Sequence, residues 1–80
     1  MRQRKRFTLA YAVAFLFDTP GTRFEMGRKV YQYVATVYDH REDGRGTNAI
    51  AVVYDFNKQE YRALNTDEPG IGAREIIFFP

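Results

Sequence analysis

The feature that most constrains this chain is an uncharged run of eleven residues, 7–17, in which large and small side chains alternate. Phe, Leu, Tyr, Val, Phe and Phe occupy its odd positions, and Thr, three Ala and Leu occupy its even positions. Successive side chains of a β-strand point to opposite faces, so this period of two places the large set on one face. We therefore predict a long strand over 7–17, with one aromatic face and one alanine-rich face.

The basic residues concentrate at the start of the chain. Four of the twelve are Arg2, Arg4, Lys5 and Arg6, which leaves eight basic against ten acidic residues in the remainder. We divide the chain into a basic N-terminal arm, 1–6, and a single globular domain, 7–80. Such an arm is typical of a solvated tail, and it is also the kind of segment that contacts phosphate groups.

The arm and the apolar run after it have the outline of a secretory signal peptide. The run is too short to span a bilayer, however, and the segment Asp18-Thr19-Pro20-Gly21 that follows contains no small-residue cleavage site. The alternation of the run also serves no purpose in a signal peptide. We therefore expect a cytoplasmic protein that does not associate with a membrane.

The rest of the chain contains short apolar stretches separated by turn residues. Segment 29–38 is mostly β-branched or aromatic, and Met26-Gly27-Arg28-Lys29 has the composition of a tight connection, so we predict a hairpin over 23–38. The capping-box pattern Thr22-x-x-Glu25 and a helical spacing of valines support the alternative of one helix at about 22–39. Further strands are predicted at 49–56, 61–64 and 74–79.

Five to six short antiparallel strands in a chain of 80 residues indicate a mostly β fold. We predict a small single-domain barrel or sandwich of the SH3-like or OB-like type. The alternative is an α+β fold in which the helix at about 22–39 packs on an antiparallel sheet.

The residues that could carry catalysis are few. There is no Cys, no Ser and only one His, which excludes a thiol nucleophile and a Ser–His triad. The acidic segment 39–43, which contains His40, lacks the ligand spacing of a calcium loop, and one His is too few for a zinc site. We therefore expect a protein that is not an enzyme and that binds no metal or cofactor.

Six Tyr and seven Phe are a large number of rings for one small core. We expect Phe to fill the core, Phe15 and Phe56 included, because the Tyr hydroxyl needs water or a partner and its ring suits an interface. Exposed Tyr beside Arg is typical of the residues that dominate protein–protein binding. We therefore predict a non-enzymatic binding module, a small regulator or inhibitor that occupies the surface of a partner protein. Its predicted contact residues are Arg28, Tyr31, Tyr33 and Arg41.

Two alternatives stay open. The first is a small nucleic-acid-binding β-barrel that uses exposed rings for unpaired bases and the arm for phosphates. The arm residues in question are Arg2, Arg4, Lys5 and Arg6. The second is a homodimeric accessory or structural protein joined through the C-terminal strand. That strand contains Ile76-Ile77-Phe78-Phe79, which is apolar on both faces and is therefore either central in the sheet or covered by a second copy.

Overall fold

The computed structural model describes residues 5–40 and 47–79 of the chain. These residues form six strands and two short helices. In chain order they are β1 (Arg6–Thr8), α1 (Leu9–Phe15), β2 (Arg23–Met26), β3 (Lys29–His40), β4 (Thr47–Asp55), β5 (Glu60–Asn65), α2 (Pro69–Gly72) and β6 (Glu75–Phe78). The strands form one antiparallel sheet in the order β1-β6-β2-β3-β4-β5, so the predicted mostly β fold is confirmed.

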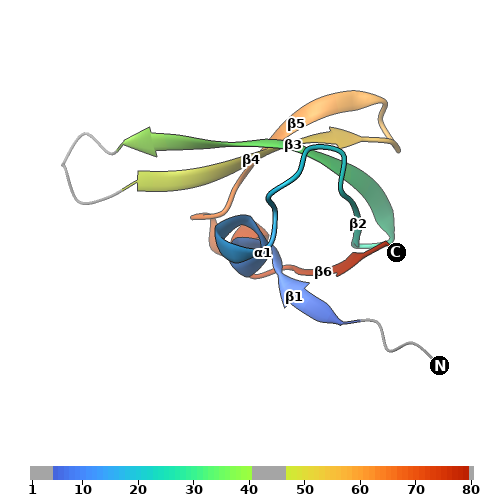
Figure 1. The fold of residues 1–80 in the computed structure, drawn as a ribbon, viewed down its shortest axis with the longest axis horizontal. Helices are drawn as coiled ribbons and strands as arrows, with labels where there is room; N and C mark the ends of the chain where they lie inside the picture. The colour runs from blue at the N-terminus through green and yellow to red at the C-terminus, as the bar shows by residue number, and fades with distance from the viewer. Residues whose placement is uncertain (1–4, 41–46, 80) are drawn as a thin grey trace.

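The sheet is strongly curved but open. In Figure 1, β2 and β6 lie below β3 and β4, and α1 lies inside the curve between them. The strand order leaves β1 and β5 at the two edges, and within the described residues these edges do not pair with each other. A closed barrel requires such pairing, so the barrel form of the prediction is not confirmed.

Residues 7–17 do not form the long strand that their alternation predicts. Only the three residues of β1 are extended, and α1 begins directly after them. Thr8 caps this helix, because its side-chain oxygen accepts a hydrogen bond from the backbone N–H of Tyr11 at 3.2 Å. The three alanines of the run favour a helix, a preference that the strand prediction neglected.

The burial pattern of α1 explains why the alternation of large and small side chains led to a wrong prediction of a strand. Its buried residues are Leu9, Ala12 and Val13, which have the spacing of one helix face. A period of two also contains every fourth residue, so Tyr11 and Phe15 share a face in a helix as they would in a strand. That face points to solvent: Phe15, which we expected in the core, is 74% exposed.

The hairpin predicted over 23–38 is confirmed, and the alternative helix at 22–39 is wrong. β2 and β3 pair antiparallel through a two-residue connection. Its residues, Gly27 and Arg28, both have positive φ, 60° and 65°. This is the geometry of a type I′ turn, whose twist matches that of the flanking strands. The β-branched and aromatic composition of the segment therefore outweighs its short capping box.

The core lies between α1 and the concave face of the sheet. Its centre is aromatic: the rings of Phe17 and Tyr33 lie parallel with centroids 4.4 Å apart, and the ring of Phe24 lies 5.3 Å from that of Phe17. Close packing of such rings stabilises the fold beyond the burial of their area. The buried apolar side chains are Leu9, Ala12, Val13, Phe17, Phe24, Met26, Tyr31, Tyr33, Ala51, Val53, Leu64 and Ile76.

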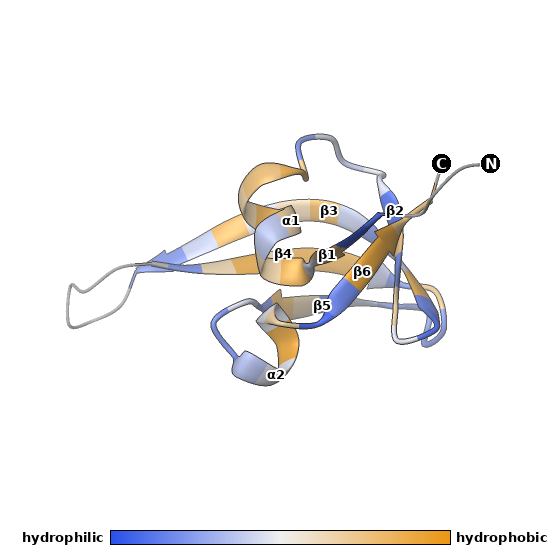
Figure 2. Cartoon of the chain, turned by 90° about the horizontal axis from the view of Figure 1, so that it is seen from below, coloured by the Kyte–Doolittle hydropathy of each residue, from blue (hydrophilic) through white to orange (hydrophobic). Residues whose placement is uncertain are grey.

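Both helices lie on the concave side of the sheet. α1 contacts β1 and β4, α2 contacts β5, and the two helices contact each other. In Figure 2, which looks at the molecule from below, α1 lies over β3 and β4, and α2 lies beside β5. In the described part of the chain, no helix is long and apolar enough to cross a membrane. Neither of the two described helices covers the outer, convex face of β3, β4 and β5.

β6 is an interior strand. It pairs with β1 on one side and with β2 on the other, and its Ile76 is fully buried. Its apolar composition therefore reflects a central position, which was one of the two explanations offered by the sequence. Both edges of β6 pair within the molecule, so its apolar composition needs no second copy to explain it, and a homodimer joined through this strand stays a prediction.

A substitution at Gly72 tests how closely α2 packs against the backbone of Thr66. A Cβ atom at this position would run into the backbone carbonyl of Thr66, whereas a Cβ atom at Gly70, in the same helix, would meet nothing within 4 Å. We expect Gly72→Ala to lower the free energy of unfolding by about 1–3 kcal/mol, the usual cost of overpacking. The matched control Gly70→Ala should change it by less than about 1 kcal/mol. Equal stabilities of the two variants in chemical denaturation would contradict this packing.

Arg28 tests the turn between β2 and β3. Its φ of 65° lies in the left-handed region, where a side chain is strained. We expect Arg28→Gly to raise the free energy of unfolding by about 0.5–1 kcal/mol, because relief of strain exceeds the extra entropy of Gly in the unfolded chain. Lys29→Gly, in the extended backbone that follows, should lower it by about the same amount. Urea denaturation measures both, and a loss of stability in Arg28→Gly counts against the turn.

Candidate binding surface

Tyr31 and Tyr33, two of the four predicted contact residues, lie in the core. Their side chains are only 3% and 6% exposed. The ring of Tyr31 stacks on that of Phe24 at a centroid distance of 5.5 Å, and the Tyr33 hydroxyl hydrogen-bonds with Thr36 Oγ1 at 2.7 Å. The prediction that these two rings are exposed to a partner is therefore wrong. A Tyr is stable inside when its hydroxyl finds a partner there, as that of Tyr33 does.

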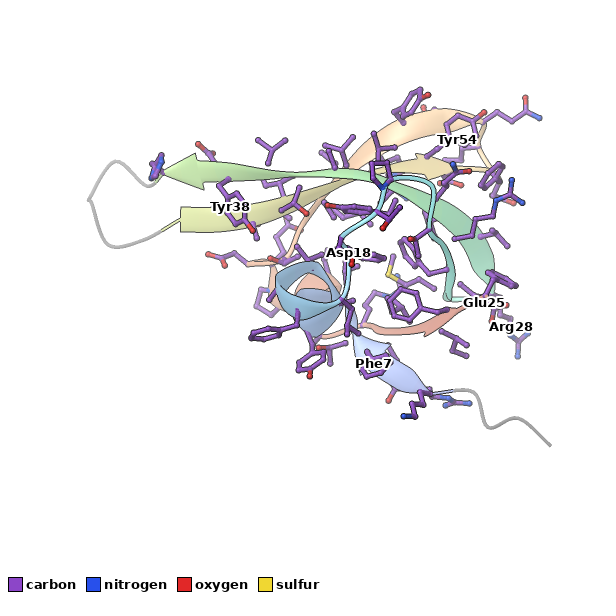
Figure 3. All side chains as sticks on the ribbon, in the orientation of Figure 1. Phe7, Asp18, Glu25, Arg28, Tyr38 and Tyr54 are labelled. Carbon is purple, nitrogen blue, oxygen red and sulfur yellow. The ribbon has the colours of Figure 1, made fainter. Side chains whose placement is uncertain are left out.

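A β-bulge in β3 determines where the next tyrosine points. The register with β4 shifts between Tyr33 and Ala35, so β3 carries one extra residue there. Tyr33 pairs with Val53 and Tyr38 pairs with Ala49, two residues on the same face of β4. Tyr38 therefore lies on the same face as Tyr33, although strict alternation predicts opposite faces. It is 59% exposed, because the β3–β4 ribbon extends beyond the core (Figure 3).

Of the other two predicted contact residues, only Arg28 lies within the described part of the chain. Arg28 is exposed at the β2–β3 turn, as Figure 3 shows, and Arg41 lies outside the described residues. Of the acidic segment 39–43, Asp39 and His40 end β3 with exposed side chains, and the rest lies outside the described residues. Among the residues that the sequence singled out, those that the structure describes do not form a common surface.

The basic arm is described only at its end. Lys5 is exposed, and Arg6 belongs to β1, where its guanidinium lies 3.5 Å from the carboxylate of Glu75. Both members of this ion pair are largely exposed, so it contributes little to stability. Arg2 and Arg4 lie outside the described residues.

Three rings and one arginine gather on the convex face of the sheet, and we call this group the aromatic patch. Its members are Arg23, Tyr54, Phe56 and Tyr61. The ring of Tyr54 meets those of Phe56 and Tyr61 edge-on, each at a centroid distance of 5.0 Å. The guanidinium carbon of Arg23 lies 5.1 Å from the centroid of Phe56, within reach of a cation–π interaction. Phe56, which we expected in the core, is 37% exposed, and Tyr61 is 70% exposed.

Strand register aligns the patch. Arg23 pairs with Gln32, Gln32 with Tyr54, and Tyr54 with Tyr61, so one row of side chains crosses β2, β3, β4 and β5. Residues paired in this way point to the same face of a sheet. In Figure 3, Tyr54 lies on the side of the sheet away from α1. The whole row therefore lies on the convex face.

An open pocket borders the patch at β2. It has a volume of about 590 Å³ and is lined by Gly21, Thr22, Arg23, Val30 and Phe79. Arg23 belongs to both the pocket and the patch. The backbone N–H of Phe56 also donates to the carbonyl of Val30 at 3.2 Å, which brings the two together. Patch and pocket form one continuous surface.

Asp55 holds the β4–β5 hairpin that carries the three rings. Its side chain is fully buried, and Oδ1 accepts hydrogen bonds from the backbone N–H groups of Asn57 at 2.9 Å and Lys58 at 3.2 Å. Oδ2 lies 3.5 Å from a guanidinium nitrogen of Arg62. A carboxylate that accepts from the backbone two and three residues ahead closes a turn. Asp55 thus sets the register between β4 and β5.

The electrostatic setting of Asp55 suits a structural role. Burial raises the pKa of its carboxyl group, but the backbone donors Lys58 and Asn57 and the Arg62 guanidinium outweigh this effect and leave the pKa below its ordinary value. A general acid or base needs a pKa near the working pH and access to a substrate. Asp55 has neither, so we assign it to the fold.

A second row of rings lies on α1 and β1. Phe7 stacks on Tyr11 at a centroid distance of 5.7 Å, and Tyr11 contacts Phe15 at 5.0 Å. At one end the row joins the core, because Phe7 also contacts Phe78 at 6.0 Å. These rings follow one short segment of chain at a spacing of four residues, whereas the aromatic patch joins side chains from separate strands. Because Tyr11 and Phe15 are exposed and separate from the aromatic patch, we call this row the control surface: a variant in it removes an exposed ring without changing the patch.

The sequence carries a signal for part of the patch. The predicted strands at 49–56 and 61–64 flank a four-residue turn, and a hairpin places residues equally distant from its turn opposite each other. With the predicted turn at 57–60 this relation places Phe56 opposite Tyr61. In the structure the turn is 56–59, so Tyr54 is the residue that pairs with Tyr61, and the predicted register is two residues off along β4. No local sequence pattern predicts the contact between Arg23 and Phe56, because the two residues are distant in the chain and are brought together only by the folded sheet.

Comparisons with protein-family models, with curated proteins and with solved structures found no match. A function must therefore be inferred from the surface itself.

The setting of Asp55 predicts acid sensitivity. Because folding lowers this pKa, ionised Asp55 stabilises the fold above the ordinary carboxyl pKa, and that contribution is lost as the pH falls through the lower value of the folded state. We expect Asp55→Asn to be less stable than wild type at pH 7, and the difference in Tm to shrink below about pH 4. Glu68→Gln, at an exposed carboxylate, should follow wild type. Parallel Tm curves for wild type and Asp55→Asn would contradict this role.

Proposed function

We propose that this chain is a non-enzymatic protein-binding module whose contact surface is the aromatic patch together with the adjoining pocket. The observation that carries the proposal is the contact of the Tyr54 ring with the rings of Phe56 and Tyr61, with Arg23 over Phe56, on a sheet face that neither described helix covers. The role that this surface supports best is that of a small regulator or inhibitor, which acts by occupying the surface of a partner protein.

The composition of the patch supports a protein partner. Tyr and Arg supply much of the binding energy at protein interfaces, since each offers a large apolar area with a polar tip. The rings of the patch hold one another in place, so little side-chain entropy remains to be lost on binding. The adjoining pocket has room for an apolar side chain of the partner, between Val30 and Phe79.

The charges around the patch also suit a protein. On the convex face of β2, Arg23 is accompanied by Glu25, so both signs are present. A surface that binds phosphates normally carries an excess of basic side chains, because affinity comes from the release of counterions. Mixed charges instead allow a protein partner to be selected by complementarity.

A second candidate is the binding of single-stranded nucleic acid. Rings presented by neighbouring strands of an open sheet, with an arginine beside them, can stack on unpaired bases. The basic arm could add phosphate contacts, but β1, which contains Arg6, lies at the opposite edge of the sheet from β5. Arg6, the described end of the arm, is therefore distant along the sheet from Tyr61.

Affinity capture with the full chain tests the proposal. The tagged protein is used to capture partners with and without nuclease, and the affinity for a captured protein is then measured by calorimetry. We expect Tyr61→Ala to weaken that affinity by about tenfold or more, because it removes the most exposed ring of the patch. Phe15→Ala removes a similarly exposed ring from the control surface on α1 and should leave the affinity unchanged.

The contrary outcomes are distinct. Equal effects of Tyr61→Ala and Phe15→Ala would place the contact elsewhere. Capture that is lost on nuclease treatment, with an affinity that falls steeply as salt is added, would favour the nucleic-acid candidate instead.

A further inference from the structure

The edge of β5 is open and regular. Among the described residues β5 pairs only with β4, in unbroken register from Glu60 to Asn65. It contains no Pro and no bulge, two features by which edge strands commonly avoid further pairing. β1, the other edge, has three residues against the six of β5. β5 is thus the longer of the two open edges.

The hydrogen-bond pattern identifies the groups that face this edge. The N–H of Thr66 donates to the carbonyl of Ala49 at 3.1 Å, so these facing residues form a hydrogen-bonded pair. Such pairs alternate along an antiparallel ladder, and the even-numbered residues of β5 therefore bond to β4. The backbone N–H and C=O groups of Tyr61 and Ala63 point the other way, toward the open edge.

Two side chains of opposite charge flank Tyr61 on the concave face of this strand. Glu60 is exposed and faces the buried carboxylate of Asp55 across the ladder. Within the described residues Glu60 has no ion pair, whereas Asp55, which lies opposite it, has Arg62. Arg62, whose side chain is 36% exposed, lies on the same face two residues further on.

Charge selects one register for pairing between two β5 strands. A two-fold axis can pass through Tyr61, Arg62 or Ala63. An axis at Arg62 places two guanidinium groups opposite each other, which is repulsive. An axis at Ala63 leaves Glu60 without a cation. It also pairs Tyr61 with Asn65 of the other copy, and the carbonyl of Asn65 already accepts a hydrogen bond of 3.2 Å within its own chain. An axis at Tyr61 places each Glu60 opposite the Arg62 of the other copy.

We propose that β5 pairs antiparallel with β5 of a second copy of this chain, with Tyr61 on the two-fold axis. The two Tyr61 residues then exchange backbone hydrogen bonds, and each Glu60 gains the guanidinium of the second copy. The Tyr61 rings meet on the convex face, so the two aromatic patches form one continuous row. The contact is small, which makes the dimer weak and dependent on concentration. The proposal does not rest on the protein-binding function.

Sedimentation equilibrium of the full chain tests the association, in a series reaching about 1 mM. We expect the mean mass to rise from monomer toward dimer. Glu60→Arg should raise the dissociation constant about tenfold, because it replaces two attractions by repulsions. Glu68→Arg makes the same charge change away from the edge and should leave the constant unchanged. A monomer at the highest concentration, or equal effects of the two variants, would overturn the proposal.

Single cysteines test the register, since the chain has no cysteine of its own. In the proposed dimer the two residues 61 face each other with Cα atoms about 5.5 Å apart, within the range of a disulfide. We expect oxidation to cross-link Tyr61→Cys but not Ala63→Cys, whose Cα atoms would lie about 13 Å apart or more. Both positions are exposed, so neither substitution disturbs the core. Absence of cross-linking at residue 61, or cross-linking at residue 63 alone, would refute this register.

Discussion

The buried carboxylate of Asp55 organises the end of the sheet on which the proposed binding surface lies. It accepts two backbone hydrogen bonds from the turn after β4 and lies beside Arg62 on β5. A buried charge is costly unless donors and an opposite charge meet it. Here two backbone donors meet Oδ1, whereas Oδ2 has the guanidinium of Arg62 at 3.5 Å but no hydrogen bond. Because side chains alternate along a strand, a slip of one residue in this hairpin would turn Tyr61 away from Tyr54. The aromatic patch and the open edge of β5 both follow from this one register.

The rings of this protein divide by position rather than by type. Tyr31 and Tyr33 pack inside the curve of the sheet, where Thr36 meets one hydroxyl, while Phe15 and Phe56 are exposed. Core and surface are thus separated by the curvature of the sheet and by α1, which covers only its concave face. Rings on the convex face stay exposed whatever their type, and this leaves a preassembled group of aromatic side chains available for contact with a partner.

Much of the strand pattern follows from local sequence. The strands predicted at 49–56, 61–64 and 74–79 agree with β4, β5 and β6 to within two residues, and the hairpin of β2 and β3 is confirmed. These segments combine β-branched and aromatic residues with turn residues at their ends. The long strand predicted for 7–17 was wrong because the alternation of this segment is also compatible with a helix. Its alanines and the Thr8 cap favour the helix. No residue pattern in the sequence predicts the bulge in β3. The bulge nevertheless exchanges the two faces of the strand, so that residues after it point to the side opposite to the one that simple alternation predicts.

Residue types and their local pattern are enough to specify that the chain is mostly β, that it contains two hairpins close to the predicted turns, and that it has no Ser or Cys nucleophile. These properties depend on residue types and on neighbours close in the chain. Which rings are buried and which form a surface follows from the packing of distant elements, because burial depends on the element that covers a face. Arg23 meets Phe56, and Tyr33 meets Phe17, through the curvature of the sheet and the placement of α1. No property of these residues taken one at a time specifies those contacts.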